Sequence, residues 1–298
     1  MIRSQQSGQY QEIGNRYYTS VHNQSKGNVM GEVIAIASQK GGVGKTTTAV
    51  NLGASLAALD KKVLLIDVDP QGSVAASFGF TRYDINSGIL DLFLDEKSIS
   101  ATIHPTGQFN FDFIPTNLWS DEGERRKLIG VTSKTKLKDE LVTIKDDYDF
   151  IIIDCPPSLG NLTLNALVAA DSLIIPIQCE YYALKALGRF LKLTRIIKNE
   201  NNPNLKYRGF LLTMVDLRNN LTKIVIEKIR YTLQGLVFNT MIPRNIRLAE
   251  VPYYGQPVIG FDKNCKGATS YLDLAYEVLG ENSNNHKFAV DNQEVKVM

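Results

Sequence analysis

Short apolar runs alternate with longer amphipathic stretches along most of the chain. The runs are rich in Val, Ile and Leu, which predicts buried strands at residues 33–38, 62–69, 111–116, 148–156, 171–178, 208–215 and 237–243. The amphipathic stretches predict helices at residues 46–59, 132–145, 162–170, 182–198, 221–233 and 268–280. Continuous apolar strands with interleaved helices are typical of a doubly wound α/β fold, a mostly parallel sheet with helices on both faces.

The two ends of the chain depart from this pattern. Residues 1–29 are polar and show no periodicity, so we expect a flexible N-terminal extension; the alternative is an arm that binds a partner. Residues 282–298 are expected to form a polar C-terminal tail. We find no internal repeat and no linker between these ends, which favours a single large α/β domain over residues 30–281.

Composition restricts the possible functions further. Of the 298 residues 44% are hydrophobic and the formal net charge is +2, so any basic surface for a nucleic acid must be local. Three widely spaced cysteines, Cys155, Cys179 and Cys265, suit neither a disulfide framework nor a metal knuckle and agree with a reducing compartment. The first residues form no apolar signal peptide, and no stretch approaches the roughly 20 apolar residues of a membrane span. We therefore expect a cytoplasmic protein without a membrane partner.

The stretch SQKGGVGKTTTAV, residues 38–50, joins the first predicted strand to the first predicted helix. Glycines in such a turn let backbone N–H groups approach phosphates, and the helix N-terminus adds a partial positive charge. Lys45 would contact the β- and γ-phosphates, and the Thr46 hydroxyl would bind Mg²⁺. A glycine turn with unrelated lysines is the alternative, but strand, helix and Gly-Lys-Thr occur together here. The expected nucleotide contacts are Gly41, Gly42, Val43, Gly44, Lys45, Thr46 and Thr47.

Three aspartates follow apolar strands: Asp67 and Asp69 in IDVDPQG, and Asp154 in IIIDCPP. Ligands of open parallel sheets bind beyond the carboxyl ends of the strands, so all three should lie near the glycine-rich loop. Asp154 is the expected acid on the Mg²⁺ side, acting through water, and one of Asp67 and Asp69 could position the attacking water. A single strand-end aspartate could equally cap the next helix, but three together argue against that explanation.

The loop departs from the usual phosphate-loop pattern, which has a glycine where this chain has Gln39, and it contains an additional lysine, Lys40. A second ammonium folded into the same pocket would repel Lys45. A long side chain at the start of the loop could instead point outward and reach phosphates held by another copy of the protein. Two nucleotides would then lie between two subunits.

The segment KGGVGKTT resembles the deviant Walker A signature of the ParA/MinD family of ATPases, in which the first lysine reaches across a dimer. The similarity continues to about residue 280 through VLLIDVDPQG, YDFIIIDCPPSLGNLTLNAL, LLTMVD and IPRNIRLAEVPYYGQPVI, which look like ParA-type DNA-partition ATPases. The resemblance implies an ATPase that uses ATP and Mg²⁺, with Lys40, Lys45 and Asp69 in catalysis. Asp69 would position water, and Asp67 would lie close to Mg²⁺. Two residues would line the adenine, Met214 and Pro243.

Other branches of the family fit less well. MinD-like proteins end in a basic amphipathic helix that docks on membranes, whereas the end of this chain is polar. The nitrogenase iron protein needs paired cysteines for an iron–sulfur cluster, and Cys155 and Cys179 do not match that arrangement. The chain also departs from the ParA pattern at Lys185, where an acid is expected, and at Asn264-Cys265, which leaves surface contacts in doubt. Residues 1–29 are too short for a helix-turn-helix, so we expect no sequence-specific repressor activity from them.

ParA-type proteins bind DNA non-specifically as ATP-bound dimers, so the resemblance implies a local basic patch that dimerisation doubles. Arg218 in MVDLRNN and Arg247 in PRNIRLAE fall where the family has its DNA-binding arginines. Contacts from such arginines to phosphates would be independent of sequence and sensitive to salt. The alternative is ordinary solvated surface charge, which is the usual state of Lys and Arg and could also explain Lys223 and Lys228.

The resemblance therefore implies a nucleoid-associated partition ATPase that forms an ATP-sandwich homodimer and segregates plasmid or chromosomal DNA. A DNA-bound, centromere-binding adaptor of the ParB type would stimulate hydrolysis of ATP to ADP and phosphate and release the dimer from DNA. Two other functions stay open: a ParA-like switch that positions a protein cargo on the nucleoid, and a metabolic P-loop enzyme such as a small-molecule kinase.

Overall fold

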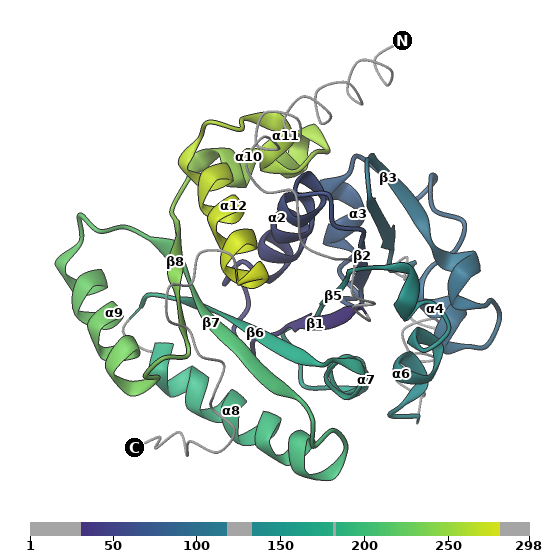
Figure 1. The fold of residues 1–298 in the computed structure, drawn as a ribbon, viewed down its shortest axis with the longest axis horizontal. Coiled ribbons are helices and arrows are strands. Elements are labelled where there is room, and N and C mark those ends of the chain that lie inside the picture. Colours follow the sequence, from purple (N-terminus) through teal and green to yellow (C-terminus); the bar gives the residue numbers. More distant parts are fainter. Residues whose placement is uncertain (1–30, 118–132, 181–182, 281–298) are drawn as a thin grey trace.

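The sheet of this protein has eight strands in the order β3-β4-β2-β5-β1-β6-β7-β8 (Figure 1). The computed structural model describes residues 31–117, 133–180 and 183–280. Every neighbouring pair of strands is parallel except β3 and β4, which are antiparallel. The strands are β1 (Glu32–Ile36), β2 (Val63–Asp67), β3 (His104–Gln108), β4 (Phe111–Ile114), β5 (Phe150–Asp154), β6 (Ser172–Gln178), β7 (Lys206–Val215) and β8 (Val237–Pro243).

Helices cover both faces of the sheet (Figure 1). One layer contains α2 (Lys45–Ala58), α3 (Ser73–Ser77), α10 (Ile246–Tyr254), α11 (Val258–Phe261) and α12 (Lys266–Leu279). The other contains α4 (Ile89–Phe93), α6 (Lys136–Leu141), α7 (Asn161–Ala169), α8 (Ala183–Glu200) and α9 (Asn220–Thr232). Two short 3₁₀ helices complete the described elements, η1 (Ile99–Thr102) and η2 (Lys145–Asp147).

Alternate residues of the central strands belong to two separate hydrophobic cores. In β1, for example, Val33 and Ala35 pack in the layer of α7 and α8, whereas Ile34 and Ile36 pack in the layer of α2 and α12. Successive side chains of a strand point to opposite faces, so a strand buried on both sides must be apolar throughout. This explains the continuous apolar runs in the sequence and confirms the doubly wound α/β fold.

The patterned elements lie where the sequence predicts them, apart from one helix. Every predicted strand is present, and the helices predicted at 46–59, 162–170, 182–198, 221–233 and 268–280 correspond to α2, α7, α8, α9 and α12. The prediction of one helix over 132–145 is wrong in extent, because α6 ends at Leu141. The β-branched run Val142–Ile144 follows, and such residues are weak helix formers. Residue 132 and the start of the helix predicted at 182 lie outside the described residues.

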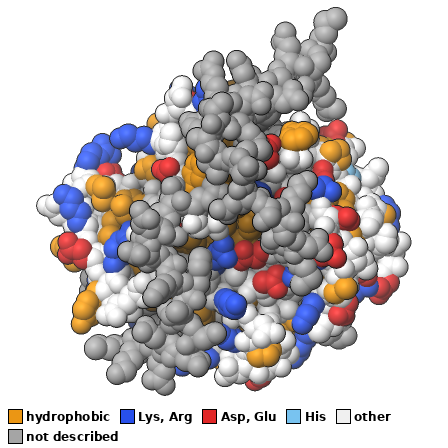
Figure 2. Space-filling view, in the orientation of Figure 1, with side chains coloured by type: hydrophobic (Ala, Val, Ile, Leu, Met, Phe, Trp, Pro, Cys, Tyr) orange, Lys and Arg blue, Asp and Glu red, His pale blue; other side chains and the backbone are white. Residues whose placement is uncertain are grey.

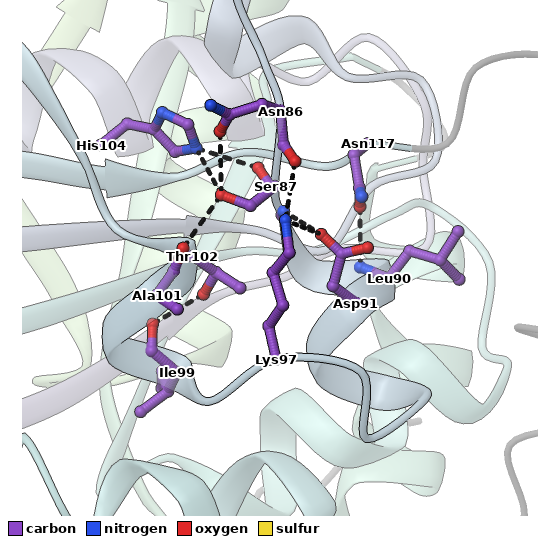
Figure 3. A network of polar contacts seen from close by, with 11 residues as sticks. Asn86, Ser87, Leu90, Asp91, Lys97, Ile99, Ala101, Thr102, His104 and Asn117 are labelled. Carbon is purple, nitrogen blue, oxygen red and sulfur yellow. Dashed lines mark hydrogen bonds and ion pairs between the residues drawn. The ribbon is translucent and has the colours of Figure 1, made fainter.

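The segment between β2 and β4 contains α3, α4, η1 and β3, which the apolar pattern does not predict. Polar contacts hold much of this segment in place (Figure 3). The Ser87 hydroxyl donates to the Ala101 carbonyl at 3.0 Å and lies 3.1 Å from Nε2 of His104, and Lys97 donates to the Asn86 carbonyl at 2.8 Å. Apolar side chains of α4 and η1, such as Leu92 and Ile99, are buried too, but these elements are too short to show a regular hydrophobic period.

The predicted extension, residues 1–29, and the predicted tail, residues 282–298, lie outside the described residues, so both stay predictions. Within the part of the chain that the structure describes, no helix is both long and apolar enough to cross a membrane. The described residues form one continuous sheet, which agrees with a single α/β unit between the two ends.

Candidate nucleotide site

The glycine-rich loop leaves β1 at the centre of the sheet and leads directly into α2. β1 pairs with β5 on one side and β6 on the other, which places the loop at the point where the strand order reverses. Gly42 and Gly44 have φ values of 70° and 87°, in the left-handed region that favours glycine. A Cβ added at Gly41 or Gly42 would meet nothing within 4 Å, so the loop backbone is open on that side.

Contacts from neighbouring elements fix the loop to the sheet. The Thr213 hydroxyl, buried in β7, donates to the Val43 carbonyl at 2.9 Å. The first turn of α2 begins with Gly44, whose carbonyl accepts from the Thr48 N–H at 2.9 Å. Lys45 is the first residue of the helix and its side chain is buried, while Thr46 and Thr47 are half-buried. The predicted phosphate contacts are therefore gathered on one loop at a helix N-terminus, where N–H groups without helical partners favour an anion.

The three predicted carboxylates lie together at the carboxyl ends of β2 and β5. Asp67 and Asp154 are direct neighbours across the two strands, and Asp154 is also the register partner of Ile36 at the end of β1. The Asp67 carboxylate accepts the Asp69 N–H at 3.0 Å and the Val74 N–H at 3.2 Å. Asp67 thus holds the turn that carries Asp69 and starts α3. Each of its oxygens keeps a second lone pair for another contact.

Asp154 is fully buried, and neither carboxylate oxygen has a hydrogen-bond partner of normal geometry among the described residues. Burial raises the pKa of Asp154 to about 7, and the charge of Asp69 adds to the rise; the nearby Thr46 hydroxyl and the Lys45 ammonium act in the opposite direction. Burial and the charge of Asp154 likewise raise the pKa of Asp67 well above its usual range. Two adjacent buried carboxyls whose pKa values are raised fit a divalent cation, because its charge would stabilise their ionised forms.

The residues present therefore fit Mg²⁺, which protein carboxylates and hydroxyls bind directly or through water. Thr46, Asp67 and Asp154 would hold it, as the sequence predicts. Among the described residues there is no cluster of three or more His, Cys, Asp and Glu side chains that could form an all-protein metal site.

Lys40 does not lie in the pocket of Lys45. Its ammonium donates to Oε1 of Gln178 at 3.1 Å and forms an ion pair with Glu180, both at the end of β6. The pair is open to solvent, since the side chains of Lys40 and Glu180 are 36% and 51% exposed. Lys40 is thus held by its own chain at the rim of the site. Its predicted contact with a second subunit stays a prediction.

Met214 and Pro243 end neighbouring strands beside the loop. Val215 of β7 is the register partner of Pro243 in β8, and the Arg244 N–H donates to the Val215 carbonyl at 3.0 Å. A Cβ placed on Gly44 would lie 4.0 Å from the terminal methyl group of Met214. Met214 has a φ of 51°, which is uncommon for a residue other than Gly, Asn or Asp and is found most often at functional positions. Their place at the strand ends suits the predicted wall of a base pocket.

Both predicted DNA-binding arginines pair with acids of their own chain. Arg218 holds Asp216 through two hydrogen bonds of 2.8 and 2.7 Å, which lowers the pKa of the Asp216 carboxyl to about 2. The Arg218 side chain is still 90% exposed. Arg247 contacts Glu250 at 2.9 Å, with Asp262 3.5 Å away. DNA phosphates would have to compete with these carboxylates.

Sequence reasoning missed several residues that shape the site, most clearly Thr213, Gln178 and Glu180. Thr213 follows the buried apolar residues Phe210, Leu211 and Leu212 in β7, and a hydroxyl buried at such a place needs a hydrogen-bond partner. Gln178 and Glu180 follow an apolar strand in the same way as Asp154 does. The strand-end argument that selected the aspartates could therefore have selected these residues too.

Comparisons with known proteins agree with this geometry. A family model described as an AAA domain matches residues 31–207. The sporulation initiation inhibitor protein Soj of Bacillus subtilis is 46% identical over 249 residues, covering 84% of this chain and 98% of Soj. The chromosome partitioning protein ParA of Myxococcus xanthus is 43% identical over 250 residues, covering 84% of this chain and 88% of that protein. The chain belongs to the ParA family.

A solved structure is also similar to this ParA-family chain. Cobyrinic acid a,c-diamide synthase from Mycobacterium smegmatis, crystallised with ADP and magnesium, superposes with a TM-score of 0.70 at 33% identity. The match covers 84% of this chain and 94% of that one.

Proposed function

We propose that this ParA-family protein is an ATP-dependent partition ATPase, which forms an ATP-sandwich dimer, binds DNA non-specifically and segregates a DNA cargo with a DNA-bound adaptor. The observation that carries the proposal is the combination of a phosphate loop bearing two lysines with three clustered carboxylates. The names of the relatives Soj and ParA support the partition role.

Each residue has a distinct task in this proposal. The loop N–H groups and Lys45 bind the phosphates, and the burial of Lys45 keeps its charge fixed on them. Bound Mg²⁺ would neutralise charge that develops on the phosphates in the transition state. Asp69 orients the attacking water, because it is half-buried beside Asp154 on a turn that Asp67 holds in place. Lys40 contacts the nucleotide of the second subunit and couples hydrolysis to dimerisation.

The basic patch supplies the attachment to DNA. Arg218 lies in the turn that follows β7, and Arg247 lies in the first turn of α10, which follows β8; β7 and β8 are adjacent strands of the sheet. Dimerisation would double this patch, so DNA affinity would depend on ATP even though the net charge of the chain is only +2. The product of the cycle would be movement or release of the protein on a nucleoid, with no sequence-specific binding by the ATPase itself.

The proposal is tested by retention on duplex DNA with ATP, ADP or no nucleotide, on two duplexes of unrelated sequence. Wild-type protein should be retained only with ATP, equally on both duplexes and less as salt rises. Arg218→Glu and Arg247→Glu should each weaken retention on both duplexes and leave ATP-dependent dimerisation intact, while Arg195→Glu, an exposed arginine on α8, serves as the control. Equal retention of the wild type and all three variants would mean that Arg218 and Arg247 are ordinary solvated surface residues.

The catalytic part is tested with two further variants. Asp69→Ala should bind ATP, dimerise and stay on DNA, because it removes only the group that orients water. Lys45→Ala should bind no nucleotide, whereas Lys138→Ala, an exposed lysine on α6, should behave as wild type. Loss of ATP binding in Asp69→Ala would make Asp69 a structural or Mg²⁺ residue and Asp67 the better candidate for water. An ATPase activity that depends on a small-molecule acceptor, without retention on DNA, would favour a metabolic enzyme.

A further inference from the structure

Helix α9 is apolar on two sides. Its inner side packs against the sheet through Thr222, Val225, Ile226 and Ile229. Its outer side exposes three large apolar side chains, Leu221, Ile224 and Tyr231, to 47%, 60% and 80%. Figure 2 shows hydrophobic side chains next to Lys and Arg on the side of the molecule where α9 lies. Large contiguous apolar groups on a surface are typical of a contact site.

The outer side has a regular spacing. Leu221, Ile224, Lys228 and Tyr231, which we call the α9 seam, are separated by three, four and three residues. This is the a/d spacing of a coiled coil. The order is the same in either direction, and its midpoint, residue 226, is also the midpoint of α9. A stripe that is symmetric about the centre of its own helix matches an antiparallel copy of itself.

A two-fold axis through the middle of α9 would bring matching side chains together. Leu221 of one molecule would pack against Tyr231 of the second copy, and Ile224 would pack along the aliphatic stem of Lys228 of the second copy. An interface of this kind is self-complementary, so each favourable contact occurs twice, once on either side of the axis. If the stripe bound a helix of an unrelated protein, its spacing would not need to be symmetric.

Charges on the α9 seam are also self-complementary. Lys228 lies within the stripe, and Glu227 lies beside it; both side chains are exposed. In the antiparallel pair, each Lys228 ammonium reaches Glu227 of the second copy, and the four charges at the axis sum to zero. Neither residue forms an ion pair with another described residue, in contrast to Arg218 in the preceding turn, which pairs with Asp216.

We propose that the α9 seam is a second interface between copies of this chain, through which ATP-bound dimers associate side by side on DNA; the DNA-dependent part rests on the proposed function. The seam is short, about 15 Å from Leu221 to Tyr231 at 1.5 Å per residue. Three apolar side chains per copy fall below what a stable dimer buries, roughly 1,200 Å² or more. Binding to one DNA molecule raises the local concentration, and such a weak contact then becomes effective.

The first experiment measures binding to two duplexes in the presence of a slowly hydrolysed ATP analogue. One duplex holds a single dimer and the other holds many. Ile224→Gln should bind the short duplex as wild type does. On the long duplex, the steep wild-type isotherm should change to one with a Hill coefficient of about one. Ile196→Gln, at a position 51% exposed on α8, is the matched control and should keep the steep isotherm.

A wild-type isotherm that is not steep on the long duplex, or a steep isotherm for Ile224→Gln, would overturn the proposal. Loss of binding to the short duplex by the wild-type protein would instead count against the proposed DNA function. The two failures are therefore distinguishable.

The second experiment tests the register without DNA, at high protein concentration in a Cys265→Ser background. A mixture of the single variants Ile224→Cys and Lys228→Cys should form a mixed disulfide dimer on mild oxidation. A mixture of Leu221→Cys and Ile224→Cys, which the antiparallel register places about two turns apart, should yield several-fold less. Equal yields of mixed dimer, or no mixed dimer in either mixture, would contradict the proposed pairing of α9 with a second copy.

Discussion

At the scale of single residues, Asp154 shows how a binding site can destabilise the protein that carries it. Its carboxyl is buried, has no hydrogen-bond partner of normal geometry, and has its pKa raised to about 7 from 3.8. The folded protein therefore binds more protons than the unfolded chain between these pH values. Stability from this group is greatest at low pH and falls as pH rises through that window. This loss of stability is expected for a carboxyl whose role is to bind a cation, because the bound cation would offset it.

Asp154→Asn should accordingly stabilise the protein in the absence of Mg²⁺, by about 1–3 kcal/mol near neutral pH. The gain should grow as the pH rises from 3.8 to about 7, level off above that, and be accompanied by loss of Mg²⁺-dependent nucleotide affinity. Thermal unfolding in EDTA at several pH values measures it. Asp69→Asn is the control, because Asp69 is half-buried and accepts the Gln71 N–H at 3.0 Å. A lower melting temperature for Asp154→Asn at pH 8 would show that the carboxylate has a stabilising partner.

Cys265 gives a second prediction at this scale. It occupies the N-cap of α12 with extended backbone angles, and its sulfur accepts the Ala268 N–H at 3.4 Å. Serine is among the preferred N-cap residues, because its oxygen is a stronger acceptor than a thiol. Cys265→Ser should raise the free energy of unfolding by about 0.5–1 kcal/mol in denaturant titrations. Cys265→Ala removes the acceptor and should lower it; equal stability of the two variants would argue against a capping role.

At the scale of elements, the strength of the apolar signal decides what the sequence predicts. The strands of the central sheet and the long helices are identified because each buries a face or stripe of Val, Ile, Leu and Ala. β3 is different, since its residues HPTGQ contain a single buried side chain, Thr106. Helices α3 and α4 have five residues each, too few to show a helical period. Helices α3 and α4 do bury apolar side chains, but over so few residues that no period can be recognised, and β3 buries only a threonine.

The approach of α3 to α10 is a contact of this kind. Gly79 follows α3 and Gly255 ends α10, and a Cβ on Gly255 would lie 2.5 Å from the Gly79 Cα. Gly255 also has a φ of 64°. Since α3 begins directly after the turn of Asp67 and Asp69, this contact supports the position of the catalytic turn.

Gly255→Ala should therefore destabilise the protein by about 2–4 kcal/mol, through both backbone strain and a clash with backbone atoms that cannot move aside. Gly235→Ala is the matched control, with a φ of 73° but nothing within 4 Å of an added Cβ. It should cost only about 1 kcal/mol, from backbone strain alone. If urea unfolding shows that Gly255→Ala and Gly235→Ala lower the free energy of unfolding equally, the backbone at the α3–α10 contact can move apart at little cost.

At the scale of the whole molecule, the sequence predicts the nucleotide site better than it predicts the surfaces. The phosphate loop and its three aspartates lie together because parallel strands end at one edge of the sheet, a rule that the order of elements alone supplies. Some acids on these surfaces are brought close only by the fold: Glu180 is far from Lys40 along the chain, and Asp262, 3.5 Å from Arg247, follows α11. Hydrophobic periodicity contains no information on such pairs.

The ion pair of Lys40 bears directly on dimerisation. For Lys40 to contact a nucleotide in a second subunit, it must leave Gln178 and Glu180 at the end of β6. Lys45 needs no such movement, because it is already buried at the start of α2. The two lysines should therefore respond differently to removal: Lys45 acts within one chain, and Lys40 acts only when two chains meet.

Lys40→Ala should keep the ATP affinity of the monomer within a few-fold of wild type. It should lose ATP-dependent dimerisation, and with it DNA retention and ~10³-fold or more in hydrolysis rate, as expected for a cation that stabilises a transferring phosphoryl group from a partner. Equilibrium ATP binding and analytical ultracentrifugation with a slowly hydrolysed analogue separate these effects. Glu180→Gln is the informative companion variant, since it weakens the hold on Lys40 without removing the lysine and should lower the protein concentration needed for dimers. Normal ATP-dependent dimers of Lys40→Ala would rule out the cross-subunit role and leave Lys40 with only its contacts to Gln178 and Glu180.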